Sequence, residues 1–258
     1  MIIEKITKTG LFYKVKLDDE TTYKFHESVI IKHSLLRKGI SVTEDKLAVA
    51  IKDNEYFLAL DKAINHLSVP RAKYDTYLYL KKYYDKELAI AVLDKVVELK
   101  LVNDKEYAKH YVFLAKKKQY GPLKIIEELK LSKVCEEDIF AALKDYSLSE
   151  EIDNCNIVFD KYVPSLKKCS INLAKKKMIS YLSNKGFSNE CITNVIEKKH
   201  ELLDNISDED KLLASAFEKL KKTKKTKDER EFKNKAIRSL TSKGFSLSKV
   251  LKIVEGRK

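Results

Sequence analysis

A short block recurs four times along the chain, and each copy has the pattern of a helix end, a turn and the start of another helix. The copies begin at Tyr79, Leu129, Leu182 and Leu240, at spacings of 50, 53 and 58 residues. Five places further on stand Tyr84, Val134, Phe187 and Phe245, and the last two copies share the run Lys-Gly-Phe-Ser. A repeat of this length is typical of a helical unit that stacks on its neighbours. The sequence therefore predicts a mainly α protein of tandem three-helix repeats forming an elongated, curved solenoid.

The N-terminal residues carry a different pattern, which precedes the repeats. Tyr13, Val15 and Leu17 alternate with lysines, a polar turn follows at 18–20, and the alternation resumes at 23–25. Such alternation around a short polar turn predicts a β-hairpin. We expect a cap with this hairpin and a helical part over 1–54, followed by repeats over 55–102, 103–148, 149–200 and 201–258.

Residues that start or stop helices give the expected boundaries within the cap. A helix is expected over 27–38, with Gly39 as its C-terminal stop. Ser41 or Thr43 should cap the next helix, whose pattern runs, with or without a break, to Leu67.

Similar signals occur inside the repeats. Asn103 or Asp104 can cap the first helix of the second repeat, and Pro122 suits a first helical turn. In three repeats a good capping residue follows the recurring aromatic, namely Asp85, Ser188 and Ser246. In the second repeat the residue at the corresponding place is Cys135, which is a weaker cap.

An elongated solenoid has a measurable consequence in solution. A compact chain of 258 residues should have a radius of gyration of about 18 Å. We expect small-angle scattering to give a value above roughly 22 Å. A value near that of the compact chain would contradict the solenoid.

Composition excludes several classes of protein. With 44% hydrophobic and 35% charged residues, the chain is expected to be soluble and ordered. No run approaches 18 apolar residues and no signal segment is present, so we expect a cytoplasmic protein that does not bind membranes. Its four cysteines lack the C-x-x-C spacing of zinc sites, and no cofactor is expected.

No constellation for catalysis is evident. Phosphate-binding glycine loops, nucleophile elbows and zinc-binding histidine motifs do not occur. The five histidines are scattered, and His110 is expected to be a core or interface residue. Acidic pairs lie where first turns of helices are expected, where they complement the helix dipole. The chain is therefore not expected to be an enzyme.

The charge balance points instead to an anionic partner. The net charge is +13, and 47 of the 52 basic residues are lysines, which attract phosphates without reading bases. Genomic base composition can produce the same bias, and basic clusters can be helix ends, solvated faces or plain linkers. Candidate contacts to a partner or to phosphates are Arg71, Lys73, Lys116, Lys117, Lys118, Lys124, Lys175, Lys221, Lys222, Lys224, Lys225 and Lys227.

Two neighbouring segments resemble a known family. The run from Leu101 to Ala108 and the run from Gly121 to Leu129 are similar to paired motifs of the RecX family of bacterial recombinase regulators. The run from Ala63 to Ser68 resembles an upstream motif of that family, and residues 15–20 and 36–39 look like its extended Gram-positive form. Lys100 stands where the family has a glycine, so that helix end must close without an easy left-handed residue.

The resemblance implies a protein without catalysis that binds the filament of the RecA recombinase on DNA. It would limit RecA activity in homologous recombination and DNA repair, and the expected state is a monomer. The main alternative is a basic helical-repeat protein that binds single-stranded or double-stranded DNA directly, by sequence-independent electrostatic contacts. A scaffold for another protein is a third possibility. The sequence leaves open the sign of the effect on RecA and which repeat dominates binding.

Overall fold

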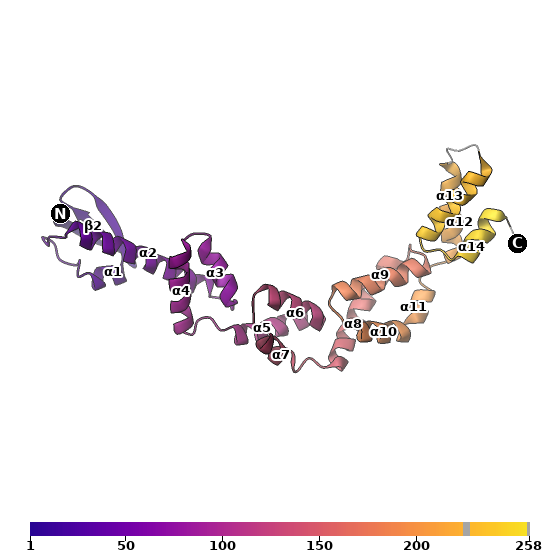
Figure 1. Cartoon of the computed structure of the whole chain (residues 1–258), viewed down its shortest axis with the longest axis horizontal. Coiled ribbons are helices and arrows are strands. Elements are labelled where there is room, and N and C mark those ends of the chain that lie inside the picture. Colours follow the sequence, from indigo (N-terminus) through magenta and orange to yellow (C-terminus); the bar gives the residue numbers. More distant parts are fainter. Residues whose placement is uncertain (224–227, 257–258) are drawn as a thin grey trace. The chain divides into compact units, whose positions relative to one another are not determined.

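The fold is mainly helical, with one small sheet at the N-terminus (Figure 1). The computed structural model describes residues 1–223 and 228–256. It contains two compact units. The first comprises Met1–His110 and Lys130–Asp138, and the second comprises Tyr111–Leu129 and Ile139–Lys258. The predicted fold class is confirmed in its helical content and its N-terminal β element, whereas the elongated shape stays a prediction.

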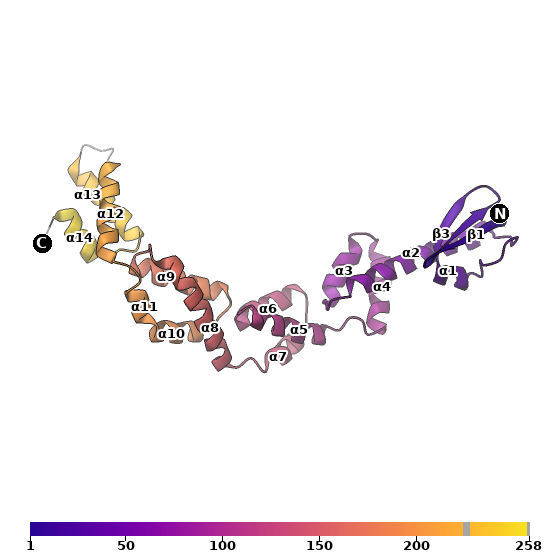
Figure 2. The same cartoon turned by 180° about the vertical axis from the view of Figure 1, so that it is seen from behind.

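The sheet contains the predicted hairpin and one additional strand. It is antiparallel, in the order β1 (Ile3–Thr9), β2 (Phe12–Leu17) and β3 (Thr22–His26). Figure 2 shows the sheet beside α1 from behind. Strand β1 lies within the N-terminal region predicted to form strands, although its own alternation is weak, with Ile3 and Ile6 as its only apolar residues. One face of the sheet packs on α1 (Glu27–Lys32) through buried Phe25, Val29 and Ile30.

The helix predicted over 27–38 is shorter than expected. Helix α1 ends at Lys32 because Ser34 takes a left-handed conformation, with φ of 54°. The Leu35 amide then donates to the Ile30 carbonyl at 3.0 Å, and the Leu35 side chain is buried. Residues 39 and 40 instead extend the pairing of β1, because Gly39 donates to Ile3 and Ile3 donates to Ile40. Burial of Leu35 and this pairing outweigh the local helical pattern.

A single long helix leads from the cap into the first repeat. Helix α2 (Glu44–His66) starts at Thr43, whose hydroxyl accepts the Lys46 amide at 3.3 Å. Thr43 is therefore the cap, and Ser41 is not. The helix passes residue 54 without a break, so the expected boundary between cap and first repeat falls inside it.

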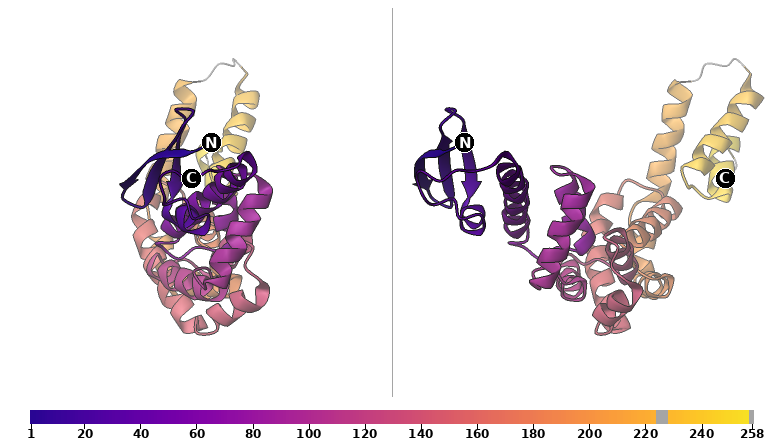
Figure 3. Two further views of the ribbon diagram at one scale, coloured as in Figure 1. Left: turned by 90° about the vertical axis from the view of Figure 1, so that its left-hand side faces the viewer. Right: turned by 60° about the vertical axis from the view of Figure 1, so that its left-hand side comes forward.

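Three principal helices occupy each predicted repeat. Helix α2 is followed by α3 (Lys73–Lys81) and α4 (Lys86–Glu98), and the second repeat contains α5 (Asp104–Lys117), α6 (Pro122–Leu131) and α7 (Glu136–Leu143). The third contains α8 (Leu148–Tyr162), α9 (Ile171–Asn184) and α10 (Asn189–Lys198), with the short η1 (Val163–Leu166) and α11 (His200–Asp204). The fourth contains α12 (Glu209–Lys222), α13 (Glu229–Ser242) and α14 (Leu247–Glu255). Helices α12 and α13 lie side by side, with the rings of Phe217 and Phe232 6.3 Å apart (Figure 3).

Most of the predicted caps are present. The Asn103 side chain accepts the Lys105 amide at 3.0 Å, and Pro122 is the first residue of α6. Asp85 and Ser188 accept amides of the first turns of α4 and α10. Ser246 is the N-cap residue of α14, as predicted, but its hydroxyl makes no cap hydrogen bond and lies 3.4 Å from the Ser248 hydroxyl.

The recurring block joins one repeat to the next. Within the second unit, the turn after α9 meets the start of α6. The Gly121 amide donates to the Lys185 carbonyl at 2.8 Å, and the Leu123 amide donates to the Gly186 carbonyl at 2.9 Å. Backbone amides at the start of α6, which have no partner within their own helix, thereby pair with backbone carbonyls just after the end of α9.

Two further junctions use the same arrangement with side chains. The Ser170 hydroxyl, before α9, donates to the Lys243 carbonyl after α13 at 2.7 Å. In the first unit, the Ser132 hydroxyl after α6 donates to Asp75 in the first turn of α3 at 3.0 Å. The recurrence in sequence therefore marks a recurring contact between middle helices.

Left-handed residues shape these turns. Gly186 and Gly244 have φ of 83° and 84°, and Lys133 takes the same role with φ of 58°. Lys100, which replaces the family's glycine, also becomes left-handed, with φ of 58°, so that helix end closes as if a glycine were present. The cost for a non-glycine residue is about 1–2 kcal/mol.

Because the backbone is closely packed at Gly186, adding a single methyl group there by Gly186→Ala should strongly destabilise the fold. A Cβ added there would lie 2.2 Å from the Lys124 amide nitrogen, with φ at +83°. Gly39 has the same φ, and nothing lies within 4 Å of its added Cβ. We expect Gly186→Ala to lower the free energy of unfolding by about 1–3 kcal/mol more than Gly39→Ala, because the packed backbone must move. Urea denaturation measures both, and equal losses would contradict the contact.

Candidate functional site

Several of the predicted contact lysines already have carboxylate partners. Lys116 lies 2.7 Å from Glu150, Lys175 lies 2.7 Å from Asp204, and Lys221 lies 2.7 Å from Glu218. Lys124 pairs with Glu128 at 3.2 Å, and this hydrogen bond raises the pKa of the Lys124 ammonium. Each of these charges is partly neutralised within the chain.

The other predicted contacts are spread over different places. Lys73 lies at the start of α3, where its backbone amide donates to Asp104 at 2.7 Å. The Lys117 ammonium lies 4.1 Å from the centre of the exposed Phe113 ring, and Lys118 and Lys222 are exposed. Lys224, Lys225 and Lys227 lie outside the described residues, so the structure describes the lysine-rich run over 221–227 only up to Thr223.

Arg71, by contrast, lines a defined hollow in the first unit. The hollow has a volume of about 530 Å³ and lies where the end of α2 meets the turn between α4 and α5. We name it the motif hollow, lined by Arg71, Lys100, Leu101, Asn103, Tyr107 and His110. Leu67 and Ser68 also line it, so segments from two of the family-like motifs meet there.

Two cationic side chains dominate the motif hollow. Arg71 is exposed, and its Nε donates to the His66 carbonyl at 3.2 Å, which orients the guanidinium and leaves its other N–H donors available. Lys100 is exposed and sits on the left-handed turn before α5. The carboxylate of Glu106, which lines the same hollow, is paired with Lys109 at 2.9 Å.

A buried polar framework holds the walls of the motif hollow. Burial raises the pKa of Asp104, which accepts the Lys73 amide, and burial also raises the pKa of the Tyr107 phenol. The His66 ring stacks on Tyr79 with centroids 3.7 Å apart. Burial, and then the nearby Arg71 charge, lower the pKa of His66, which favours its neutral form. Of the charged side chains that line the hollow, those of Arg71 and Lys100 have no ion-pair partner among the described residues.

His110 was predicted to be a core or interface residue. It does not lie in the core, because its side chain is exposed at the rim of the motif hollow. The buried face of α5 consists instead of small residues, Ala108, Val112 and Ala115. His110 therefore can contact a partner.

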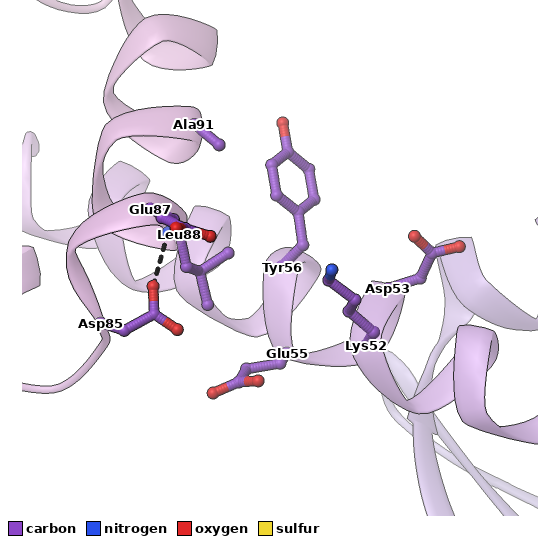
Figure 4. A pocket seen from close by; sticks show the side chains of 8 residues that line it. All are labelled: Lys52, Asp53, Glu55, Tyr56, Asp85, Glu87, Leu88 and Ala91. Atoms are coloured by element: carbon purple, nitrogen blue, oxygen red, sulfur yellow. Dashed lines mark hydrogen bonds between the residues drawn. The ribbon is translucent and has the colours of Figure 1, made fainter.

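A second hollow in the first unit is acidic, as Figure 4 shows. It has a volume of about 370 Å³ between α2 and the start of α4. Asp53 is paired with Lys32 and His33, and the hydrogen bond from Lys32 holds the pKa of Asp53 below its usual value. The Asp85 carboxylate accepts the Leu88 amide at 2.8 Å. These two carboxylates therefore have structural partners.

A third hollow, in the second unit, is lined by lysines that were not among the predicted contacts. Lys168, Lys219 and Lys243 surround about 240 Å³ of space, with Leu173, Leu212 and Phe245 at its apolar part. We name it the lysine hollow. These lysines stand far apart in the sequence, and only the packing of α9, α12 and the turn after α13 brings them together.

Among the described residues, no group of three or more potential metal ligands comes together. None of the described helices is both long and apolar enough to span a membrane. The arrangement of the motif hollow suits the capture of carboxylate or phosphate oxygens by fixed cations.

The fold and the hollows thus define a helical-repeat protein whose candidate sites are binding surfaces. No family model matches the chain. The regulatory protein RecX of Bacillus cytotoxicus is 32% identical over 238 residues, which cover 90% of this chain and 86% of that protein. The regulatory protein RecX of Enterococcus faecalis is 28% identical over 247 residues, covering 94% and 92%.

A solved structure supports the same assignment at the level of the fold. The crystal structure of a regulatory protein RecX matches with a TM-score of 0.62 at 23% identity, over 76% of this chain and 98% of that one. The chain belongs to the RecX family of regulatory proteins, which confirms the resemblance of its motifs.

Proposed function

We propose that this protein is a non-catalytic regulator that binds the RecA–DNA filament and limits RecA activity in recombination and repair. Family membership supports regulation of RecA. On this proposal the protein acts in the cytoplasm as a monomer. Its effect comes from occupying the filament.

One observation carries the proposal more than any other. The motif segments at 63–68 and 101–108 are separated by a whole helical hairpin, yet residues of both line the motif hollow. Leu101 is 46% exposed, so this position is not needed for the core. Motif residues that face an open hollow beside two free cations are better explained by a partner than by packing.

The chemistry of the hollow fits an acidic group on a protein partner. The guanidinium of Arg71 is already oriented by the His66 carbonyl, so less freedom is lost on binding. Its planar fork matches a carboxylate in two parallel hydrogen bonds. Leu67 and Leu101 add apolar surface beside it.

A second candidate function is direct binding to single-stranded or double-stranded DNA. The net charge of +13 and the uncompensated lysines of the lysine hollow favour it. The two functions overlap, since the RecA filament itself contains DNA. Contacts to DNA would be electrostatic and independent of sequence.

Co-sedimentation separates the two functions. The full-length protein is mixed with RecA filaments on single-stranded DNA, and in parallel with the bare DNA, between 50 and 200 mM salt. Binding by phosphate contacts alone should fall by orders of magnitude over this range, whereas a protein–protein contact should persist on the filament. Equal sedimentation with filament and bare DNA at every salt concentration would favour the DNA-binding function instead.

A further inference from the structure

The lysine hollow presents three positive charges that the chain itself does not neutralise. Lys168 precedes α9, Lys219 lies on α12, and Lys243 begins the turn after α13. All three side chains are exposed, and none has an ion-pair partner among the residues that the structure describes. No carboxylate lines the hollow.

This situation differs from that of the lysines in the sequence runs. Lys175 and Lys221 each have a carboxylate oxygen 2.7 Å from the ammonium. Three like charges around one hollow repel one another, and an anion placed between them relieves this repulsion. The unpaired lysines are therefore the stronger anion-binding groups, although no charge run marks them.

A neighbouring hollow extends the positive surface through Lys176. It has a volume of about 370 Å³ and shares Phe245 with the lysine hollow. Thr241 and Lys175, whose charge Asp204 partly neutralises, also line it. Positive side chains thus lie on both sides of the turn at Gly244 and Phe245. A chain of anions can follow such a surface, whereas one small anion would use only part of it.

We propose that the lysine hollow binds the phosphodiester backbone of single-stranded nucleic acid. Lysine is a point charge suited to phosphate, whereas carboxylate recognition favours the planar fork of arginine, and no arginine lines either hollow. The apolar part formed by Leu173, Leu212 and Phe245 can accept sugar and base faces, which a duplex keeps inside its stack. This inference rests on the second candidate function, direct binding to DNA, and assigns that binding to one site, which needs no recombinase.

The test uses the full-length chain and a labelled oligothymidylate. One variant carries Lys168→Gln, Lys219→Gln and Lys243→Gln. Its matched control carries Lys199→Gln, Lys211→Gln and Lys233→Gln, which removes the same charge from lysines paired with Asp160, Asp208 and Glu229 in the same unit. Fluorescence anisotropy gives the affinity at several salt concentrations, and circular dichroism confirms that both variants melt like the parent.

The lysine-hollow variant should reduce the slope of log affinity against log salt by about 2, since each contact to a single strand contributes about 0.7. If variant and parent bind equally at 1 M salt, where electrostatic contacts are screened, this difference in slope makes the variant bind roughly 100-fold more weakly at 0.1 M. The control should change the slope far less. Each single substitution in the hollow should reduce this slope by about 0.7.

Three results would overturn the proposal. Equal losses in variant and control would show a diffuse field with no site at the hollow. Competition by polyglutamate as effective as by the oligonucleotide would make the ligand a carboxylate chain. A duplex that binds as tightly as the single strand, with the same loss in the variant, would rule out single-strand selection. None of these results bears on filament binding by the motif hollow, which co-sedimentation tests separately.

Discussion

Replacing Phe187 by alanine should lower the free energy of unfolding of the second unit by about 3–5 kcal/mol, as large truncations in cores do. The side chain is 1% exposed and packs in a cluster with Leu182, Cys191 and Val195. It follows the left-handed Gly186 directly, so it also fixes the turn that contacts α6. The apparent melting temperature should fall by roughly 10 °C.

Phe113 supplies the matched control in the same unit. It is 54% exposed, and its ring contacts the Lys117 ammonium. Phe113→Ala should cost less than about 1 kcal/mol, which is the scale of an exposed cation–π contact. Thermal and urea denaturation compare the two variants with the parent. Similar melting of Phe187→Ala and Phe113→Ala would show that the recurring aromatic does not hold the repeat.

Reversing the two charges of the motif hollow should abolish most binding to the RecA filament. In the variant with Arg71→Glu and Lys100→Glu, acidic groups of a partner would meet carboxylates. Each charge-assisted hydrogen bond contributes about 1.5–3 kcal/mol. Loss of two such bonds should weaken binding at least about 100-fold.

The control carries Arg37→Glu and Lys38→Glu, which make the same change of charge at exposed residues of the same unit. It should retain most of the affinity, because these residues do not line the hollow. Co-sedimentation or surface plasmon resonance on immobilised filaments measures both variants. Equal weakening by the two variants would assign the effect to overall charge and remove the motif hollow from the binding site.

Features with strong local signals were predictable from sequence. Thr43, Asn103 and Pro122 act within one helical turn, so their roles follow from residue type and position. The recurring apolar block was also visible, since a buried helix face repeats with a fixed period. The structural role of this block could not be predicted, because the contact between Gly121 and the turn at Gly186 joins positions far apart in sequence.

Features that depend on tertiary contacts escaped prediction. The helix expected over 27–38 stops early because Leu35 is buried and Gly39 and Ile40 pair with β1. Ser246 has the right residue type for a cap, but its hydroxyl is directed elsewhere.

The candidate contacts illustrate the same limit for the site. Runs of lysine are easy to see, but Lys116 is paired with Glu150, 34 positions away. Lys168, Lys219 and Lys243 each stand alone or in pairs in the sequence, so no charge run announces the lysine hollow. Arg71 was predicted and does line a hollow, whereas Lys100 was noted only as a departure from the family's glycine.

The most direct test of the proposed function is the rate of DNA-dependent ATP hydrolysis by RecA of the same organism, on single-stranded DNA at near-physiological salt. Full-length protein, added at ratios well below one per RecA, should lower this rate, because a bound regulator affects a filament of many subunits. The variant with Arg71→Glu and Lys100→Glu should have little effect, while the Arg37 and Lys38 control should act like the parent. An unchanged rate with the full-length protein, up to equimolar amounts, would contradict regulation of RecA by this chain.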